Sequence, residues 1–176
     1  MTDLVHLQLG QTRPLHTERV DFDALVQETL SMVVGAASIG SAPVHVHASS
    51  NAIVQGDRAR LGRVLQNIIG NALKYSPAAT PVYIDLAASD QWVTISVRDQ
   101  GLGIPASDIA HVFEPFYRTS TVVGIPGSGI GLAGAKSIVE HHGGRITLES
   151  TLGVGTEVTV VLPRSPSSMV RSTRDG

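Results

Sequence analysis

Apolar side chains recur at helical spacing between residues 61 and 75. Intervals of three and four residues place them on one face of a helix, which predicts an amphipathic helix packed on a core. Asp57 stands before this run as a candidate N-cap, and Pro77 stands after it as a stop. The stripe consists of Leu61, Val64, Leu65, Ile68, Ile69, Ala72 and Leu73.

Helical spacing also predicts helices over residues 22–37 and 132–142 and a short helix over residues 107–113. Asp21 or Asp23 can cap the first of these helices, and the glycine pair at 143–144 can end the second. Residues 1–10 are expected to form the last turns of a helix that begins before Met1.

Alternation of apolar and polar residues predicts the strands of the protein. The segments are a short strand ending at Val20 and strands over 44–48, 81–88, 92–98, 145–150 and 156–162. Residues 51–56 are expected only to lead into the central helix. Runs of adjacent strands indicate a mixed, largely antiparallel sheet with three main helices on one face. The predicted fold class is therefore an α/β two-layer sandwich.

Composition narrows the class of protein. The chain has 176 residues, 42% of them hydrophobic, which is enough for one packed domain. Cysteine is absent, which excludes disulfides and thiolate sites, and the net charge of −2 gives no field that attracts nucleic acid or an anionic membrane. No apolar run approaches the roughly 18 residues that span a bilayer. We expect a soluble piece of a larger protein.

Polar residues stand on the flank of the central apolar stripe. Asn67, Asn71 and Lys74 are spaced by four and then three residues, and Tyr75 lies beside them. One interpretation is a solvated polar face. The other is a ligand site, in which amide oxygens coordinate a hard cation, the lysine meets a phosphate and the tyrosine offers its ring to a base. Asparagine is a mediocre helix former, so two of them in register favour the ligand site.

Glycines at residues 101 and 103 follow Asp99 at the end of a predicted strand. Such glycines permit a positive φ and a close approach of a ligand to the backbone. The aspartate could accept a hydrogen bond from an amino group. An ordinary Asp-Gly turn is the alternative interpretation.

A second glycine-rich segment, Gly127-Ser128-Gly129-Ile130-Gly131-Leu132, opens a predicted helix. Backbone N–H groups at a helix N-terminus can bind an anion. The segment does not follow a predicted strand, which argues against a Rossmann site, and it lacks the Gly-Lys-Ser/Thr ending of a Walker loop.

Two other groups of residues call for an interpretation, either as ordinary surface or packing residues or as a functional site. His45 and His47 point to the same side of a predicted strand, so metal ligation competes with a solvated face, and no third ligand stands nearby in the sequence. Three of the seven aromatic residues gather in residues 113–118. They are expected to form a packing wedge under a loop at residues 119–126.

Four segments in fixed order, NIIGNALKY, DQGLG, FEPFYR and GSGIGL, resemble the N, G1, F and G2 boxes of a known family. That family is the catalytic and ATP-binding domain of sensor histidine kinases, within the Bergerat-type superfamily of gyrase, mismatch-repair and heat-shock chaperone ATPases. The resemblance covers roughly residues 20–163. It implies the end of a dimerisation helix (1–11) and the catalytic domain (12–163). Residues 164–176, rich in serine and arginine and without a core pattern, are expected to form a disordered tail.

The resemblance implies that ATP and Mg²⁺ bind here. Asn67 and Asn71 would hold the metal, Lys74 would contact phosphate and Arg118 would reach the terminal phosphate. Asn71, Lys74 and Arg118 would be the catalytic residues. Tyr75 would stack on adenine, Asp99 would accept from its amino group, and Thr156 would join that site through water. The glycines would shape the base pocket and the lid. The implied nucleotide-binding set is completed by Gly101, Gly103, Ile104, Gly127, Gly129, Gly131 and Leu132.

The resemblance implies that the domain transfers the γ-phosphate to a histidine on a dimerisation domain. A response regulator receiver domain would act downstream of that histidine. The phosphoacceptor box is absent from the chain, since His6 and His16 lack its context, and the lid at 119–126 is short and uncharged. The implied partners are protein domains, with no nucleic acid and no membrane contact by this piece. A monomeric fragment of a cytoplasmic, homodimeric kinase is expected. The alternatives are a serine kinase of the anti-sigma type and a nucleotide-binding module without catalysis.

Overall fold

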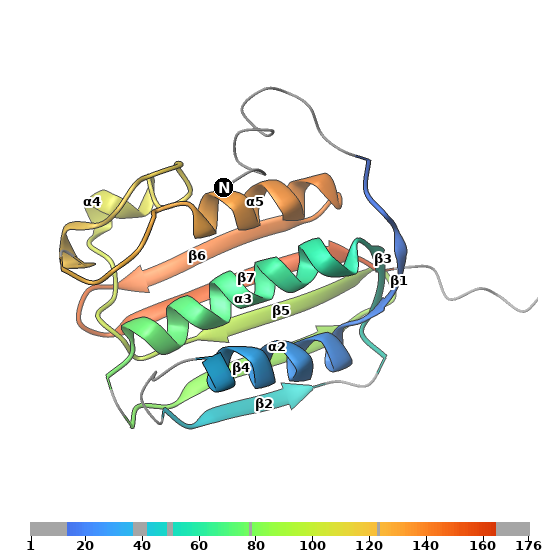
Figure 1. The fold of residues 1–176 in the computed structure, drawn as a ribbon, viewed down its shortest axis with the longest axis horizontal. Helices are drawn as coiled ribbons and strands as arrows, with labels where there is room; N and C mark the ends of the chain where they lie inside the picture. The colour runs from blue at the N-terminus through green and yellow to red at the C-terminus, as the bar shows by residue number, and fades with distance from the viewer. Residues whose placement is uncertain (1–13, 37–41, 49–50, 78, 123, 165–176) are drawn as a thin grey trace, which may run out of the picture.

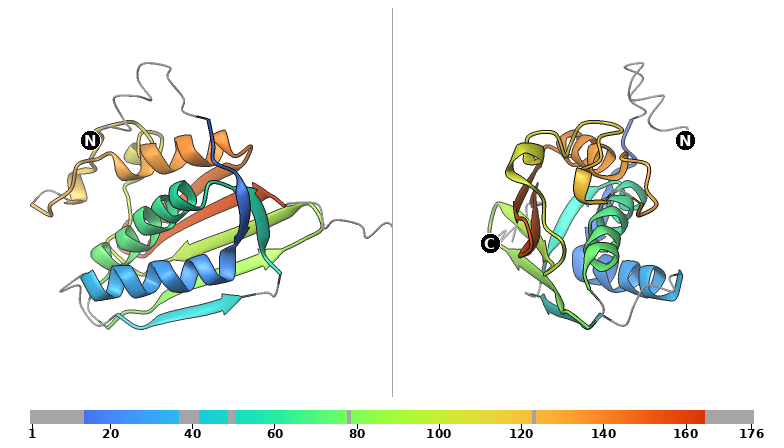
Figure 2. Two further views of the ribbon diagram at one scale, coloured as in Figure 1. Left: turned by 45° about the vertical axis from the view of Figure 1, so that its right-hand side comes forward. Right: turned by 90° about the vertical axis from the view of Figure 1, so that its left-hand side faces the viewer.

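The computed structural model describes residues 14–36, 42–48, 51–77, 79–122 and 124–164. It consists of a layer of helices on one face of a five-stranded sheet (Figure 1). Figure 2 shows the two layers from the side, and none of the described helices lies on the opposite face of the sheet, which is called the uncovered face below. The predicted α/β two-layer sandwich is confirmed. The predicted N-terminal helix and C-terminal tail lie outside the described residues, except for Arg164.

The large sheet has the strand order β2-β4-β5-β7-β6. The strands are β2 (Val44–Ala48), β4 (Val82–Ala88), β5 (Trp92–Arg98), β6 (Arg145–Thr151) and β7 (Gly155–Pro163). Only the pairing of β2 with β4 is parallel among these strands. The inward positions of β4 and β5, such as Ile84 and Ile95, are buried as the alternation predicts.

The helix layer consists of α2 (Phe22–Ala36), α3 (Arg58–Tyr75) and α5 (Gly131–His141), and α3 packs between the other two. The whole predicted apolar stripe of α3 is buried in the core. The side chain of Asp57 accepts a hydrogen bond from the amide of Arg60 at 3.1 Å, so the predicted N-cap is confirmed. The polar flank of α3 therefore has a fixed direction relative to the sheet.

Residues 51–56 differ from the sequence prediction. They contain a strand, β3 (Ile53–Gly56), which pairs antiparallel with β1 (Glu18–Asp21) in a separate two-stranded sheet. Four residues are too few for a visible alternation pattern. The pairing partner lies over 30 residues earlier in the chain, so local pattern did not predict the strand. The short helix over residues 107–113 was also predicted too long, since α4 covers only Ala106–Ile109.

Loops gather at one end of the α3 helix, where β5 ends. The β6–β7 turn is joined to the loop after β5 by a hydrogen bond from the amide of Gly153 to the carbonyl of Leu102, at 2.8 Å. Gly103 has a φ of +64°, and a Cβ there would collide with the carbonyl of Thr151. Glycine is therefore required for this close approach. A 3₁₀ turn, η1 (Ser120–Val122), lies in the segment that leads to α5.

The uncovered face of the sheet is polar. His45 stacks on Tyr83 with ring centroids 5.3 Å apart, and His47 Nδ1 lies 3.1 Å from a carboxylate oxygen of Asp85. Both histidines are exposed, which agrees with the solvated strand face. The described residues contain no cluster of three side chains that could hold a metal ion.

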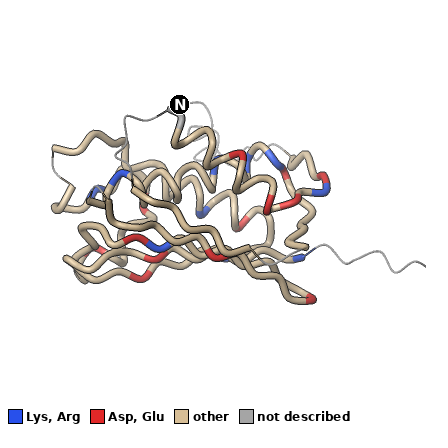
Figure 3. Tube along the Cα trace, turned by 90° about the horizontal axis from the view of Figure 1, so that it is seen from below, with Lys and Arg blue, Asp and Glu red and all other residues tan. Residues whose placement is uncertain are grey.

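Acidic and basic residues are interspersed along the described part of the chain (Figure 3). Neither sign is confined to one part of the described chain, so the charges do not form a long run of one sign along it. None of the helices in the described ranges is long and apolar enough to cross a membrane.

Candidate functional site

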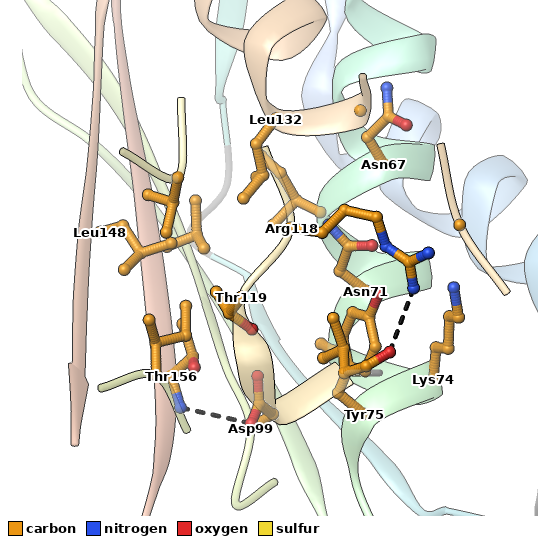
Figure 4. Close-up of a pocket in the computed structure, with 18 of the residues that line it drawn as sticks. Asn67, Asn71, Lys74, Tyr75, Asp99, Arg118, Thr119, Leu132, Leu148 and Thr156 are labelled. Carbon is orange, nitrogen blue, oxygen red and sulfur yellow. Dashed lines mark hydrogen bonds between the residues drawn. The ribbon is translucent and has the colours of Figure 1, made fainter. Parts of the chain in front are cut away.

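A pocket of about 290 Å³ lies between α3 and the sheet, at the end where the loops gather. Figure 4 shows α3 on one side of it and the strand ends on the other. All the residues proposed from the sequence as nucleotide ligands line this pocket, with the exception of Gly101. Residues from five separated parts of the sequence, at 67–75, 99–104, 118, 127–132 and 156, are thus brought into one cavity.

Gly101 lies just behind the pocket wall. A Cβ at this position would collide with the carbonyl of Tyr75 and would lie 2.8 Å from a carboxylate oxygen of Asp99. The amide of Gly101 donates to that same oxygen at 2.8 Å. The glycine therefore holds the aspartate in place and keeps the loop close to the end of α3.

The end of the pocket that is lined by β5, β6 and β7 is called its inner end, and Asp99 is its acidic group. Its Oδ1 also accepts from the amide of Thr156 at 3.3 Å, while the amide of Asp99 donates to the carbonyl of Thr156 at 2.9 Å. Partial burial raises the pKa of Asp99, and the two amide hydrogen bonds oppose this rise. The half-buried carboxylate presents acceptor oxygens to whatever enters this end.

The polar flank of α3 lines the middle of the pocket. Asn71 points into the cavity beside Arg118, with Asn67 one turn further along the helix (Figure 4). The amide nitrogen of Asn67 donates to the carbonyl of Arg63 at 2.9 Å, which directs its carbonyl oxygen towards the start of α5. A Cβ on Gly131 would lie 2.8 Å from that oxygen, so this glycine leaves the oxygen room.

Two cations lie at the outer end of the pocket. Lys74 donates to the carbonyl of Pro126, and its Nζ lies 5.0 Å from the ring centroid of Tyr75. Arg118 donates to the carbonyl of Val122 at 3.1 Å and also to that of Ile125. Both cations therefore contact the backbone of the segment that was predicted to be the lid. These carbonyl partners are neutral, so the positive charges are not balanced by these contacts.

Apolar side chains complete the inner end of the pocket. Val97, Leu148 and Val158 line it from three neighbouring strands. Sequence analysis did not single them out as site residues, although each stands at an inward position of its strand alternation. These residues face the pocket because the loops lie above them. That arrangement depends on the tertiary structure. Further lining residues that were missed are Tyr117, Thr119, Val122 and Ser128.

The aromatic segment is only partly the packing wedge that was predicted. Phe113 packs against the core and Tyr117 lines the pocket, but the side chain of Phe116 is 61% exposed. Phe116 also has a φ of +66°, a strained conformation for a bulky residue. Its amide donates to the carbonyl of Gly129 at 3.0 Å, which links this segment to the glycines before α5.

The arrangement divides the pocket into two chemical parts. The inner end combines apolar strand residues with the Asp99 carboxylate, which suits a flat heterocycle that carries an amino group. The outer end combines Lys74 and Arg118 with the glycine-rich start of α5, which suits phosphates. A phosphorylated nucleoside fits both ends at once.

Comparisons with known proteins also indicate a nucleotide-binding domain. Residues 56–166 match the family described as Histidine kinase-, DNA gyrase B-, and HSP90-like ATPase. The chain is 36% identical over 167 residues to the sensor-like histidine kinase SenX3 of Mycobacterium tuberculosis, covering 93% of this chain and 40% of SenX3. It spans well under half of the length of the curated relatives that it matches.

Two solved structures resemble the fold. The mycobacterial sensor histidine kinase MprB matches with a TM-score of 0.76 and 32% identity, covering 85% of this chain and 99% of that one. Full-length ShkA in complex with AMPPNP matches with a TM-score of 0.79 and 27% identity, covering 94% of this chain and 35% of ShkA. From the family match, the relatives and the shared fold, we conclude that the chain belongs to the histidine kinase-, DNA gyrase B- and HSP90-like ATPases and is an ATP-binding catalytic domain of the sensor histidine kinase type.

Proposed function

We propose that this domain binds ATP with Mg²⁺ and transfers the γ-phosphate to a histidine nitrogen on a dimerisation domain. The observation that carries this proposal is that one pocket has an acceptor carboxylate at one end and two cations at the other. Phosphoryl transfer depends on positioning and charge neutralisation more than on covalent chemistry by the protein. The residues of the pocket supply both.

The base would occupy the inner end. Asp99 would accept from the adenine amino group, Thr156 would join that contact through water, and Tyr75 would stack on the ring. Gly101, Gly103 and Ile104 would form the wall of this part, since the close packing of the two glycines leaves no room for other side chains. Guanine has a carbonyl where adenine has its amino group, so Asp99 favours adenine.

The phosphates would occupy the outer end. Lys74 and Arg118 would exchange the lid carbonyls for phosphate oxygens, which gain more from a positive charge than neutral carbonyls do. The backbone of residues 127–132, with Gly127, Gly129, Gly131 and Leu132 at the pocket, would present N–H groups to the phosphates. Asn71, Lys74 and Arg118 are therefore the proposed catalytic residues.

The donor set suits a magnesium ion. Asn67 and Asn71 would be its protein ligands, because Mg²⁺ prefers oxygen ligands and binds through few protein groups together with phosphates and water. The carbonyl oxygen of Asn67 has the space left by Gly131. The ion would neutralise part of the phosphate charge. Through it, the two asparagines would hold the triphosphate beside α3, within reach of Lys74 and Arg118.

The whole protein would be a homodimeric kinase with this domain in the cytoplasm. Residues 1–11 would end the dimerisation helix, and a response regulator receiver domain would take the phosphoryl group from the histidine. The isolated chain would be a monomer.

The test is transfer of labelled γ-phosphate from ATP to the matching dimerisation domain supplied as a separate chain. The product should be acid-labile, as phosphohistidine is. Arg118→Ala should reduce the transfer rate at least about tenfold, because it removes a cation where charge shifts in the reaction. It should change ADP affinity much less, since ADP has no terminal phosphate.

Arg145→Ala is the matched control, because Arg145 is an exposed cation on β6 that does not line the pocket. Transfer by Arg118→Ala at the wild-type rate contradicts the role of Arg118. Acid-stable phosphoserine on a partner protein would establish the anti-sigma type of kinase instead.

A further inference from the structure

Ser150 on β6 connects three parts of the site without lining the pocket itself. Its Oγ accepts from the amide of Ile104 at 2.9 Å and donates to the carbonyl of Gly155 at 2.9 Å. It also lies 2.8 Å from the Oγ1 of Thr156, its register partner on β7. One half-buried hydroxyl thus joins the loop after β5, the start of β7 and a side chain of the pocket.

One placement of the two hydroxyl protons makes all three contacts of Ser150 hydrogen bonds. A serine hydroxyl has one proton to donate and can accept two hydrogen bonds. The carbonyl of Gly155 can only accept, so it takes the serine proton. The amide of Ile104 can only donate. The hydroxyl of Thr156 must then donate to Ser150, and this arrangement uses the full hydrogen-bonding capacity of Ser150.

The direction of the threonine proton sets the chemistry of the pocket. Thr156 lines the inner end, and its amide is already bonded to Oδ1 of Asp99. With its proton held by Ser150, the Thr156 hydroxyl offers only lone pairs to the cavity. The carboxylate of Asp99 also offers only lone pairs. Both polar side chains at this end therefore act as acceptors.

We propose that Ser150 is a positioning residue for base selection, which holds the Thr156 hydroxyl as an acceptor so that the pocket favours a base edge with an amino group. This inference rests on the proposed binding of adenine nucleotides. A base with a carbonyl at that edge, such as hypoxanthine, meets two acceptors and no donor from these side chains. Without Ser150, the Thr156 hydroxyl is free to turn and donate towards that carbonyl, directly or through the bridging water.

Calorimetry with ADP and inosine diphosphate, which differ at this edge of the base, tests the proposal. Ser150→Ala should lower the ratio of the inosine diphosphate Kd to the ADP Kd by about two- to tenfold, the range expected for one hydrogen bond. Ser150→Thr retains the hydroxyl on a strand position that suits threonine and should restore the ratio. Thr147→Ala, at an exposed position of the same strand, should leave the ratio unchanged.

A double-variant comparison shows whether Ser150 acts through Thr156. Thr156→Val removes the hydroxyl, so adding Ser150→Ala should then change the ratio no further. If Ser150→Ala does not fold, Ser150→Cys, of similar size but with a weak donor and acceptor, carries the same expectation.

The outcomes are separable from failure of the proposed function. If the unmutated chain binds no ADP, the proposed function is wrong and this inference falls with it. If the unmutated chain binds ADP, and Ser150→Ala weakens both nucleotides equally, the serine only supports the fold and the inference alone is wrong. A lower ratio that persists in the Thr156→Val background also overturns it.

Discussion

Asp99 combines a functional requirement with an energetic penalty. Its carboxylate is held by the amides of Gly101 and Thr156, yet partial burial disfavours its charge and raises its pKa. Protonation therefore stabilises the folded state. The ionised carboxylate reduces the free energy of unfolding above its folded pKa, and this penalty disappears below the ordinary value of 3.8.

We predict that Asp99→Asn weakens ADP binding at least about tenfold, because a charge-assisted hydrogen bond is lost and the amide can present a donor to the adenine amino group. The variant keeps an oxygen that can accept from Gly101 and Thr156, so its Tm at pH 7 should be no lower than that of the wild type. Calorimetry and thermal unfolding measure the two effects.

The pH dependence provides the control. The wild type should gain stability relative to Asp99→Asn as the pH falls through the pKa of Asp99, and the gain should level off below about pH 4. ADP affinity of the wild type should fall over the same range. An unchanged Kd for ADP in Asp99→Asn would mean that the base binds elsewhere.

At the scale of elements, α3 is held at its start by one residue with several partners. Asp57 accepts from the amides of Arg60 and His16, at 3.1 and 3.3 Å, and its own amide donates to Nε2 of His142 at 2.9 Å. Burial acts to raise the pKa of Asp57, but the hydrogen bonds from Arg60 and His16 and the charge of Arg60 outweigh it and lower the pKa. The cap thus connects the start of α3 to the segment before β1, through His16, and to the end of α5, through His142.

We predict that Asp57→Ala lowers the free energy of unfolding by about 0.5–2 kcal/mol, the usual range for an N-cap. Asp57→Asn should lose less, because asparagine caps helices nearly as well. Denaturant unfolding at pH 7 measures both. A cap contribution would be excluded if Asp57→Ala and Asp57→Asn unfolded at the same denaturant concentration.

The lowered pKa determines the sign of the pH effect. Asp57 contributes stability above its unfolded pKa, near the ordinary value of 3.8, and this contribution is lost as the pH falls through its lower folded pKa. The stability difference between the wild type and Asp57→Asn should therefore shrink in acid. This direction is opposite to that expected for Asp99→Asn.

On the scale of the whole molecule, the helices and the large sheet share one core. Ile69 of α3 is 0% exposed and belongs to the same buried cluster as Ile84 and Ile95 of the sheet. The sheet and the helices should therefore lose their structure together. The pocket lies between these layers, so its shape depends on the same packing.

We predict that Ile69→Ala lowers the free energy of unfolding by about 2–5 kcal/mol, through lost burial and a cavity. Fluorescence of Trp92, the one tryptophan of the chain, and far-UV circular dichroism should report the same lowered midpoint. Met32→Ala is the control, because this side chain of α2 is 53% exposed. Separate midpoints for the two probes would show that the layers unfold independently.

Local spacing alone determined much of this protein. The intervals along residues 61–75 decided which side chains of α3 face the core, and the same intervals placed Asn67, Asn71 and Lys74 on its flank. Alternation in residues 82–98 was sufficient for the β4–β5 hairpin, and it put Asp99 at a strand end. These features depend on residues a few positions apart, whose geometry follows from helix and strand periodicity.

Only the tertiary structure decided the rest. The β1–β3 pairing, the parallel pairing of β2 with β4 and the contacts of Lys74 and Arg118 with the lid carbonyls have no local signature. Ser150 is 46 residues from Ile104, and Asp99 is 57 residues from Thr156. Such hydrogen bonds form only when folding closes long loops and fixes both partners on a packed scaffold. The sequence thus determined the chemical groups of the site, and the fold decided their hydrogen-bonding directions.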